Sequence, residues 1–377
     1  MQPETLAHLA PASEEEVTEV IRERLGRGLP VKVTAGGTRI EAGHLPHQSL
    51  STNALSGVVS YEPGEMTLIA RAGTPLADIE SMLAAEGQSL AFEPPDMRCL
   101  LGQGGTPTLG GVIATNASGP RRLQAGACRD HVLGLRFVDG QGRLIKTGGR
   151  VMKNVTGLDL CKLHCGGYGT LGIVTEIAIK TLPLLPAQGT LAVRNVTAEQ
   201  AVAIFAKALS TPFEVSGAAW QEETAFLRIE GLEPQMRYRR DRLLALFTSF
   251  DIELLEDEAS RALWRSIRDV ESHAGTGQPV WKILVKPSDG PLVLQELTRR
   301  GGSATLDWGG GLVWYSGPAA ADEVRRAAAP GHATLIRRSG LPGPAFPPQS
   351  GAVRELSVRI RQTFDPAGIF NTGLMDA

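Results

Sequence analysis

Cysteine is scarce in this sequence, and its four residues show no metal-binding spacing. They are Cys99, Cys128, Cys161 and Cys165 in a chain of 377 residues, with no Cys-x-x-Cys pair. A structural zinc site or an iron–sulfur cluster within the chain is therefore not expected, and no metal ligands are predicted. His164 would share a helix face with Cys161 and Cys165, but no fourth ligand is evident, so we interpret the three as structural. Cysteine this sparse is typical of a reducing cytosol.

Long apolar runs and an excess of one charge are also missing. No apolar stretch approaches the roughly 18 residues that suggest a membrane-spanning helix. The N-terminus lacks the basic and then apolar order of a secretory signal. The formal net charge is -2, so neither nucleic acid nor an anionic membrane is indicated as a partner. We expect a cytoplasmic protein, with at most a peripheral association with the inner membrane through a complex.

The first half of the chain mixes helix and strand signals and then becomes rich in glycine and proline. Ser13-x-x-Glu16 is a capping box that predicts a helix through about residue 25. Thr74 is expected to cap a second helix that has Pro75 at its first position. Three further elements are predicted from pattern: a short strand at 31–33, a hairpin that turns at Asp139-Gly140, and a helix near 153–165.

The order strand, helix, strand, strand, helix, strand occurs twice between about residues 190 and 340. The first copy begins with a strand at 190–195 and a helix capped by Thr197, and the second copy ends with a strand at 332–337. Each copy is a split β-α-β unit. Two such units side by side would form one broad sheet with helices on one face. A helix at about 351–364 follows.

Three glycine-rich clusters are candidates for ligand binding. The strand at 31–33 runs into the cluster 35–39, where backbone N–H groups freed by glycines can surround phosphate oxygens, although an ordinary turn explains this loop equally well. Small residues dominate 106–119, which suits a flat ligand lying against the backbone, with a tightly packed loop as the alternative. The cluster 167–172 matches G-x-G-x-x-G. The dinucleotide fingerprint needs a strand before it and a helix after it, and here the order is reversed.

Taken in order, these clusters resemble the FAD-binding fold shared by vanillyl-alcohol oxidase and para-cresol methylhydroxylase (PCMH). The resemblance is carried by the loop 35–39, Ala72-Gly73-Thr74-Pro75-Leu76, Glu93-Pro94-Pro95, Gly110-Gly111…Asn116…Gly119, residues 169–176, and Asp365-Pro366…Asn371-Thr372-Gly373. It implies an α+β protein with a two-subdomain PCMH-type FAD-binding domain in residues 1–185. A cap domain of two split β-α-β units would occupy 190–340, and a C-terminal segment, 350–377, would return to the FAD-binding domain.

The resemblance also implies a role for each cluster. The residues that would hold the FAD pyrophosphate are Ala35, Gly36, Gly37, Thr38 and Arg39. Those that would line the isoalloxazine ring and the ribityl chain are Pro94, Pro95, Thr108, Gly110, Gly111, Thr115, Asn116 and Gly119. The adenine side would meet backbone atoms of Gly172, Ile173 and Val174, and Asn371 would complete the site. Relatives with a covalent flavin often have His where Thr38 stands, so the FAD is expected to be non-covalent.

Over its whole length the chain resembles the family of glycolate oxidase FAD-binding subunits of type E. The stretches that carry this resemblance are 118–122, 129–134, 151–157, 307–310 and 331–334. The family implies oxidation of glycolate, a small 2-hydroxyacid, to glyoxylate, with hydride transfer to flavin N5. It also implies two partners, a larger FAD-binding glycolate oxidase subunit and an iron–sulfur subunit, which receive the electrons.

Candidate catalytic residues lie on the last strand of the second repeat. His332 would act as a base or a carboxylate ligand, although a lone strand histidine is usually structural. Arg337 would hold the substrate carboxylate, because arginine binds carboxylates in a bidentate manner. Leu158 and Tyr168 depart from the pattern of single-chain relatives. Two alternatives therefore stay open: an FAD-containing structural or electron-relay subunit without turnover of its own, and a free-standing flavin oxidase of another alcohol.

Overall fold

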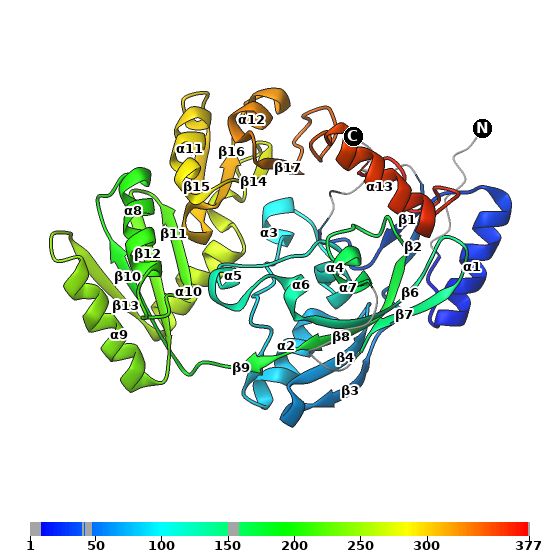
Figure 1. Ribbon diagram of the computed structural model, residues 1–377, viewed down its shortest axis with the longest axis horizontal. Coiled ribbons are helices and arrows are strands. Elements are labelled where there is room, and N and C mark those ends of the chain that lie inside the picture. The colour runs from blue at the N-terminus through cyan, green and yellow to red at the C-terminus, as the bar shows by residue number, and fades with distance from the viewer. Residues whose placement is uncertain (1–8, 40, 42–46, 150–157, 376–377) are drawn as a thin grey trace.

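The computed structural model describes residues 9–39, 41, 47–149 and 158–375 of the chain. Two large sheets organise these residues, and they lie in different halves of the molecule (Figure 1). The first is an antiparallel sheet of five strands, in the order β3 (Val58–Glu62), β4 (Thr67–Arg71), β8 (Ile173–Lys180), β6 (Val132–Val138) and β7 (Leu144–Gly148). The mixed helix and sheet content confirms the predicted α+β class.

A smaller unit beside the five-stranded sheet contains the start of the chain. Helix α1 (Glu14–Arg27) begins after Ser13, whose hydroxyl accepts a hydrogen bond from the Glu16 N–H at 3.1 Å. The Glu16 carboxylate accepts from the N–H of Ala12 at 2.8 Å, one residue earlier than a standard capping box requires. Strand β1 (Val31–Thr34) then pairs in parallel with β2 (Gln48–Ser51), and Phe370 from the C-terminal segment forms a bridge to Val31.

The predicted cap at Thr74 is wrong. Helix α2 (Leu76–Ala85) begins one residue later, and Pro75 occupies the N-cap position without a capping side chain. The Thr74 hydroxyl instead donates to the carbonyl of Arg71 at 2.7 Å and accepts from the N–H of Gly57 at 3.0 Å. These two backbone partners, Arg71 in the preceding turn and Gly57 far earlier in the chain, engage the hydroxyl, which is therefore not available to the helix.

The β6–β7 hairpin is longer than a two-residue turn at Asp139-Gly140. Its loop covers residues 139–143, because the Asp139 carboxylate accepts hydrogen bonds from the N–H groups of Gln141 and Arg143. Of the helix predicted near 153–165, the structure shows α7 (Leu160–His164), while residues 153–157 lie outside the described part of the chain.

The second sheet has eight strands. Their order is β13 (Ile252–Glu256), β10 (Ala187–Val193), β12 (Thr224–Gly231), β11 (Gly217–Gln221), β15 (Ser303–Asp307), β16 (Leu312–Ser316), β14 (Val280–Leu284) and β17 (His332–Arg337). The helices that accompany them are α8 (Ala198–Leu209), α9 (Glu233–Leu246), α10 (Asp257–Arg268), α11 (Gly290–Thr298) and α12 (Ala321–Ala328). The predicted cap of α8 is confirmed, because Thr197 and Gln200 form a reciprocal capping box.

The two faces of the eight-stranded sheet have different neighbours, because successive side chains of a strand point to opposite sides. Trp281 and Ile283 of β14 pack in one core with Leu297 of α11. Val280 and Leu284, on the other face, pack with Leu100 of helix α3 (Arg98–Leu101), which belongs to the half that contains the five-stranded sheet. This second face is therefore turned toward that half of the molecule.

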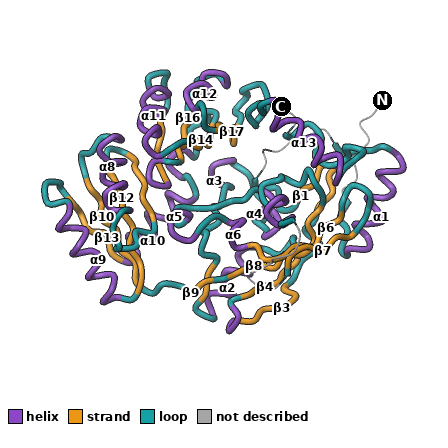
Figure 2. Tube along the Cα trace, in the orientation of Figure 1, coloured by secondary structure: helices purple, strands orange, loops and turns teal. Residues whose placement is uncertain are grey.

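Short helices and long loops fill the space between the two sheets (Figure 2). Besides α3, the helices of this segment are α4 (Leu109–Ala114), α5 (Arg122–Ala125) and α6 (Cys128–His131). The remaining elements are β5 (Gln88–Ser89), β9 (Leu182–Pro183), α13 (Gly351–Phe364) and the 3-10 turns η1 (Pro63–Glu65), η2 (Glu271–His273), η3 (Pro287–Asp289) and η4 (Trp308–Gly310). No helix among the described residues is long and apolar enough to cross a membrane.

Candidate cofactor-binding site

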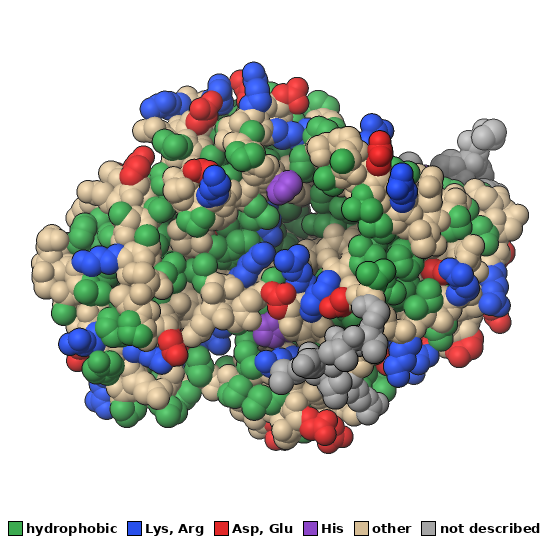
Figure 3. Space-filling model, in the orientation of Figure 1, with side chains coloured by type: hydrophobic (Ala, Val, Ile, Leu, Met, Phe, Trp, Pro, Cys, Tyr) green, Lys and Arg blue, Asp and Glu red, His purple; other side chains and the backbone are tan. Residues whose placement is uncertain are grey.

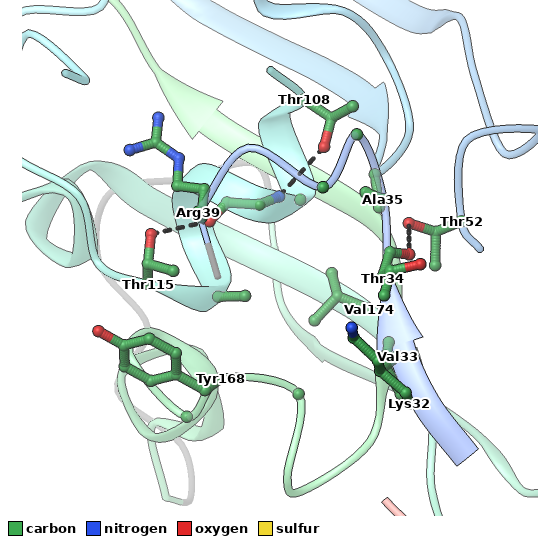
Figure 4. A pocket seen from close by; sticks show the side chains of 18 of the residues that line it. Lys32, Val33, Thr34, Ala35, Arg39, Thr52, Thr108, Thr115, Tyr168 and Val174 are labelled. Carbon is green, nitrogen blue, oxygen red and sulfur yellow. Dashed lines mark hydrogen bonds between the residues drawn. The ribbon is translucent and has the colours of Figure 1, made fainter. Parts of the chain in front are cut away.

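A groove of about 360 Å³ lies in the half that contains the five-stranded sheet, where β1, α4 and the loop after α7 meet (Figure 4). All three glycine-rich clusters contribute to its walls. The predicted FAD-binding residues that line it are Ala35, Gly36, Gly37, Thr38, Arg39, Thr108, Gly110, Gly111, Thr115, Gly172 and Val174. Its volume falls within the range of roughly 300–1,000 Å³ typical of ligand pockets.

The loop after β1 is held by close backbone contact with the second cluster. A Cβ built on Gly36 would lie 1.7 Å from the carbonyl oxygen of Thr106, so no larger residue fits there. Gly37 has a φ of 69° and nothing within 4 Å of where its Cβ would be. Within the described residues, the N–H groups of Gly36 and Gly37 donate no hydrogen bond. Free N–H groups in such a turn can form an anion-binding nest.

Helix α4 forms another wall, and sequence pattern did not reveal it as a helix. The Thr108 hydroxyl caps it by accepting from the N–H of Gly111 at 3.3 Å, and the Thr115 hydroxyl donates to the Gly111 carbonyl at 2.8 Å (Figure 4). A Cβ on Gly110 would lie 2.8 Å from the Ala72 Cβ, so this glycine permits the helix to pack. The nearest atom to a Cβ on Gly111 would be 3.4 Å away, so Gly111 keeps the groove wall flat.

Asn371 holds two walls of the groove together without lining it. Its side-chain oxygen accepts from the N–H of Val33 at 2.7 Å, and its amide nitrogen donates to the carbonyl of Tyr168 at 2.7 Å. These bonds tie β1 to the third glycine cluster through a residue near the C-terminus. The closing Asn-Thr-Gly stretch therefore positions the groove, which is a more indirect role than direct contact with a ligand.

His164 also lines the groove, a position that sequence reasoning had not assigned to it. Burial lowers the pKa of its imidazole to about 4, and its ring centroid lies 3.9 Å from that of Phe137. Its Nε2 has no hydrogen-bond partner among the described residues. Burial also raises the pKa of the neighbouring Cys165 thiol to about 12. No group of three His, Cys, Asp or Glu residues that could hold a metal is found in the described part of the chain.

Besides Asn371, five predicted cofactor residues do not line the groove. Ile173 is buried in the core beside β1. Asn116 accepts the Arg129 N–H at 3.0 Å through its side-chain oxygen, and the Gly119 carbonyl accepts from Trp308 Nε1 at 3.0 Å. Pro94 and Pro95 are buried and follow directly after Glu93. The stretches around Glu93 and Gly119 therefore lie where the two halves of the molecule meet.

A buried ion network joins the two halves at this point. The Glu93 carboxylate accepts two hydrogen bonds from the Arg228 guanidinium of β12, at 2.8 and 2.9 Å, and a third from the Arg121 N–H at 2.9 Å. The Arg121 side chain also pairs with Glu230. Burial alone would raise the pKa of Glu93, but the neighbouring arginines outweigh it and hold that pKa below its usual range.

Basic residues gather on either side of the junction, and Figure 3 shows Lys and Arg side chains around a central hollow. Arg39 lines the groove, and its guanidinium is turned away from the glycine loop in Figure 4. Lys282 of β14 and Arg122 of α5 lie near the Trp308 ring, at 5.2 and 4.3 Å from its centroid. Sequence reasoning missed Lys282. One available signal was a lysine flanked by four apolar residues in the strand at 280–284.

The two predicted catalytic residues lie on β17 and are not brought together with the groove. His332 is exposed at the start of the strand, opposite Leu284. The Arg337 guanidinium donates to the carbonyls of Leu100 at 2.7 Å, Gln278 at 2.9 Å and His273 at 3.1 Å. Their catalytic roles remain predictions, and in this structure Arg337 ties the eight-stranded sheet to α3.

Comparison with solved structures supports the fold. Alkyldihydroxyacetonephosphate synthase superimposes with a TM-score of 0.67 over 97% of this chain and 76% of its own, at 15% sequence identity. Identity this low bears on architecture alone. The two chains share a fold over almost all of the present one.

Comparison of sequences identifies the family. A family model described as an FAD binding domain matches residues 5–148. The glycolate oxidase subunit GlcE of Escherichia coli is 33% identical over 366 residues, which is 95% of this chain and 96% of that one. The D-lactate dehydrogenase of Archaeoglobus fulgidus is 28% identical over 72% of this chain and 60% of its own. This chain therefore belongs to the family of FAD-dependent oxidoreductases that includes the Escherichia coli glycolate oxidase subunit GlcE.

Proposed function

We propose that the chain is the FAD-binding subunit of a complex that oxidises a 2-hydroxyacid, with glycolate as substrate and glyoxylate as product. The similarity to GlcE, a protein named as a subunit, over nearly the full length of both chains is the observation that carries this proposal. Relatives named D-lactate dehydrogenase and D-2-hydroxyglutarate dehydrogenase support the substrate class. The partners would be a larger FAD-binding subunit, as in proteins named GlcD, and an iron–sulfur subunit.

The residues that line the groove fit the chemistry that FAD binding needs. Gly36 and Gly37 would offer free N–H groups to the pyrophosphate, and Gly111 would leave a flat wall for the ribityl chain and ring. Gly172 and Val174 line the groove where the adenine would lie. Thr38 stands where a covalent histidine would be needed, so these contacts would hold the cofactor without a bond. The bound FAD supplies the acceptor for the hydride that leaves the substrate α-carbon.

The chain itself must orient the substrate and remove the hydroxyl proton. His332 is the candidate base. It is exposed at the start of β17, and Thr334 and Ile336 farther along the same strand line a hollow together with Arg39. The Glu93–Arg228 pair would fix the eight-stranded sheet relative to the flavin loops. Residues 1–185, 190–340 and 350–377 would then act as the FAD-binding domain, the cap and the returning segment.

A second candidate is an FAD-containing relay subunit without turnover of its own. The engagement of Arg337 with three backbone carbonyls favours it, because this guanidinium is then not available to bind a carboxylate. Anaerobic mixing of the purified, FAD-loaded chain with glycolate or D-lactate separates the two. Bleaching of the flavin by the chain alone contradicts the relay. Bleaching only after addition of the partner subunits supports the relay, and no bleaching under either condition contradicts the proposed function.

A further inference from the structure

Lys282 has an unusual position for a lysine. It lies in the middle of β14, between Trp281 and Ile283, both of which are fully buried on the helix-covered side of the sheet. The alternation of the strand places Lys282 on the opposite face, together with Val280 and Leu284, and that face is turned toward the flavin-binding half. A lysine in such a strand needs a partner or a function, because burying an unpaired charge is costly.

No carboxylate pairs with Lys282 among the described residues, and its neighbours are mainly cationic or aromatic. Its Nζ lies 5.2 Å from the centroid of the Trp308 ring, and the Arg122 guanidinium carbon lies 4.3 Å from the same centroid. Arg122 also forms no ion pair with the described residues. The Trp308 indole is anchored by its hydrogen bond to the Gly119 carbonyl, in the second glycine-rich cluster. The two cations are thus held at the boundary between the sheet and the flavin loops.

The electrostatic environment of Lys282 and Arg122 favours the binding of an anion. Burial lowers the pKa of Lys282 to about 8, and the positive charges of Arg122 and Arg39 contribute to this shift. Asp307, at the end of β15, is the acidic residue whose charge raises the pKa of Lys282. Burial raises the pKa of this carboxyl to about 7, so near neutral pH it carries only part of a negative charge. Asp307 therefore offsets the charge of Lys282 only in part. The acids that act on Arg39, which are Asp96 and Asp269, and the one that acts on Arg122, which is Asp130, form no ion pair with these arginines among the described residues.

Arg39 extends the same cationic region to the groove. Its Nε and Nη2 atoms are buried and have no hydrogen-bond partner among the residues that the structure describes. The residue lines both the groove and a smaller hollow that it shares with Thr334 and Ile336 of β17. Thr334 is the register partner of Lys282. Arg39 therefore connects the cofactor groove with the strands that carry Lys282.

We propose that Lys282 and Arg122, held on either side of the junction beside Trp308 and reinforced by Arg39, bind the carboxylate of the substrate. This inference rests on the proposed function, since it names the residues that recognise the acid group of a 2-hydroxyacid. It assigns to these three residues the role that sequence reasoning gave to Arg337. The carboxylate would supply the counter-charge that the protein does not provide.

Binding of oxalate, a carboxylate that cannot be dehydrogenated, tests the assignment independently of turnover. The FAD-loaded full chain is titrated with oxalate by calorimetry, alongside Lys282→Gln and Arg122→Gln. Each variant is expected to weaken binding at least about tenfold, the loss typical of a charge-assisted hydrogen bond, with unchanged FAD content. Lys286→Gln, an exposed lysine just beyond the end of β14, is the matched control and should bind like the wild type.

The pH dependence gives a second readout. Because Lys282 must be protonated to bind, oxalate affinity should fall as the pH rises above about 8. Lys282→Arg, with Asp307, Arg122 and Arg39 unchanged, should restore the oxalate binding that Lys282→Gln loses. Its affinity for oxalate should not fall as the pH rises above about 8. Wild-type protein that does not bind oxalate, or variants that bind it equally well, would overturn the assignment. An FAD-loaded wild type that binds oxalate but is reduced by no 2-hydroxyacid would contradict only the proposed function.

Discussion

Glycines in the groove have different physical tasks although they are the same residue type. Gly36 and Gly110 allow backbone segments to touch, since an added Cβ would meet Thr106 or Ala72 at less than 3 Å. A Cβ on Gly37 would meet no atom within 4 Å, and one on Gly111 would make only ordinary contacts, the nearest at 3.4 Å, on a wall where a ligand would lie. The first pair is thus required by the fold and the second pair by the cofactor, so their substitutions should have different effects.

Replacement of Gly37 by valine should remove FAD while the chain stays folded. A branched residue at φ 69° is strained by about 1–2 kcal/mol, and its side chain would enter the space proposed for the pyrophosphate. Gly28→Val is the matched control, because Gly28 has a φ of 62°, is also exposed and lies at the end of α1. Both variants should lose similar thermal stability, but only Gly37→Val should lose more than about nine-tenths of its FAD. Equal FAD content in the two variants would refute the role of Gly37.

Replacement of Asp307 by asparagine should change how stability depends on pH. Burial raises the folded-state pKa of this carboxyl from 3.8 to about 7, so folding favours its neutral form. The wild type should therefore lose stability relative to Asp307→Asn as the pH rises from about 4 to about 7, with little further change above pH 7. Thermal unfolding across this range measures the difference, and exposed Asp251→Asn serves as a control. A difference independent of pH would show that Asp307 is not buried as described.

At the scale of elements, the contact between β12 and the loop at Glu93 joins the two halves. Glu93→Ala would leave the Arg228 guanidinium, whose side chain is 1% exposed, without its bidentate partner. Loss of one partner of a buried pair costs about 3–5 kcal/mol. The exposed pair of Arg194 and Glu253 is a suitable comparison, with side chains 48% and 46% exposed.

The expected loss in urea unfolding free energy is therefore about 3–5 kcal/mol for Glu93→Ala and below about 1 kcal/mol for Glu253→Ala. Equal losses of stability in the two variants would mean that the network does not hold the halves together.

Elements with local signals could be predicted, and those fixed by tertiary contacts could not. The caps at Ser13 and Thr197 depend on residues three positions apart, and both were found from sequence. Thr74 was misassigned because its hydroxyl bonds to Gly57, 17 residues away along the chain. Helix α4 was missed because its glycines hide the helical pattern, and Gly110 is explained only by its contact with Ala72.

The candidate site shows the same division. The glycine clusters were readable as ligand-binding segments, and the structure brings eleven of the predicted cofactor residues to one groove. Lys282 could not be assigned, since its meaning depends on Arg122, Trp308 and Arg39, which come from three other segments of the chain. A site made between two halves of a molecule leaves no contiguous pattern in the sequence.

At the scale of the whole molecule, the protein places the candidate cofactor groove, with Arg39 and Arg122 near it, in one half and Lys282 on the facing sheet of the other. The network around Glu93 and the bond from Trp308 to Gly119 hold these surfaces against each other. The arrangement supports an oxidation in which one half carries FAD and the other recognises an anionic substrate. Purification with the native partner subunits should yield a complex that contains more flavin than this chain alone and also contains iron. The amounts of flavin and of iron should not exceed those of the cofactors that the chains of the complex bind.

We propose that the groove holds one FAD without a covalent bond. The most direct measurement is the flavin released by acid denaturation of the purified chain after saturation with FAD and removal of the excess. We predict about one FAD per chain in the released fraction, none left on the precipitated protein, and little in Gly37→Val. A chain that takes up no FAD, or one whose flavin stays with the precipitated protein, would contradict it.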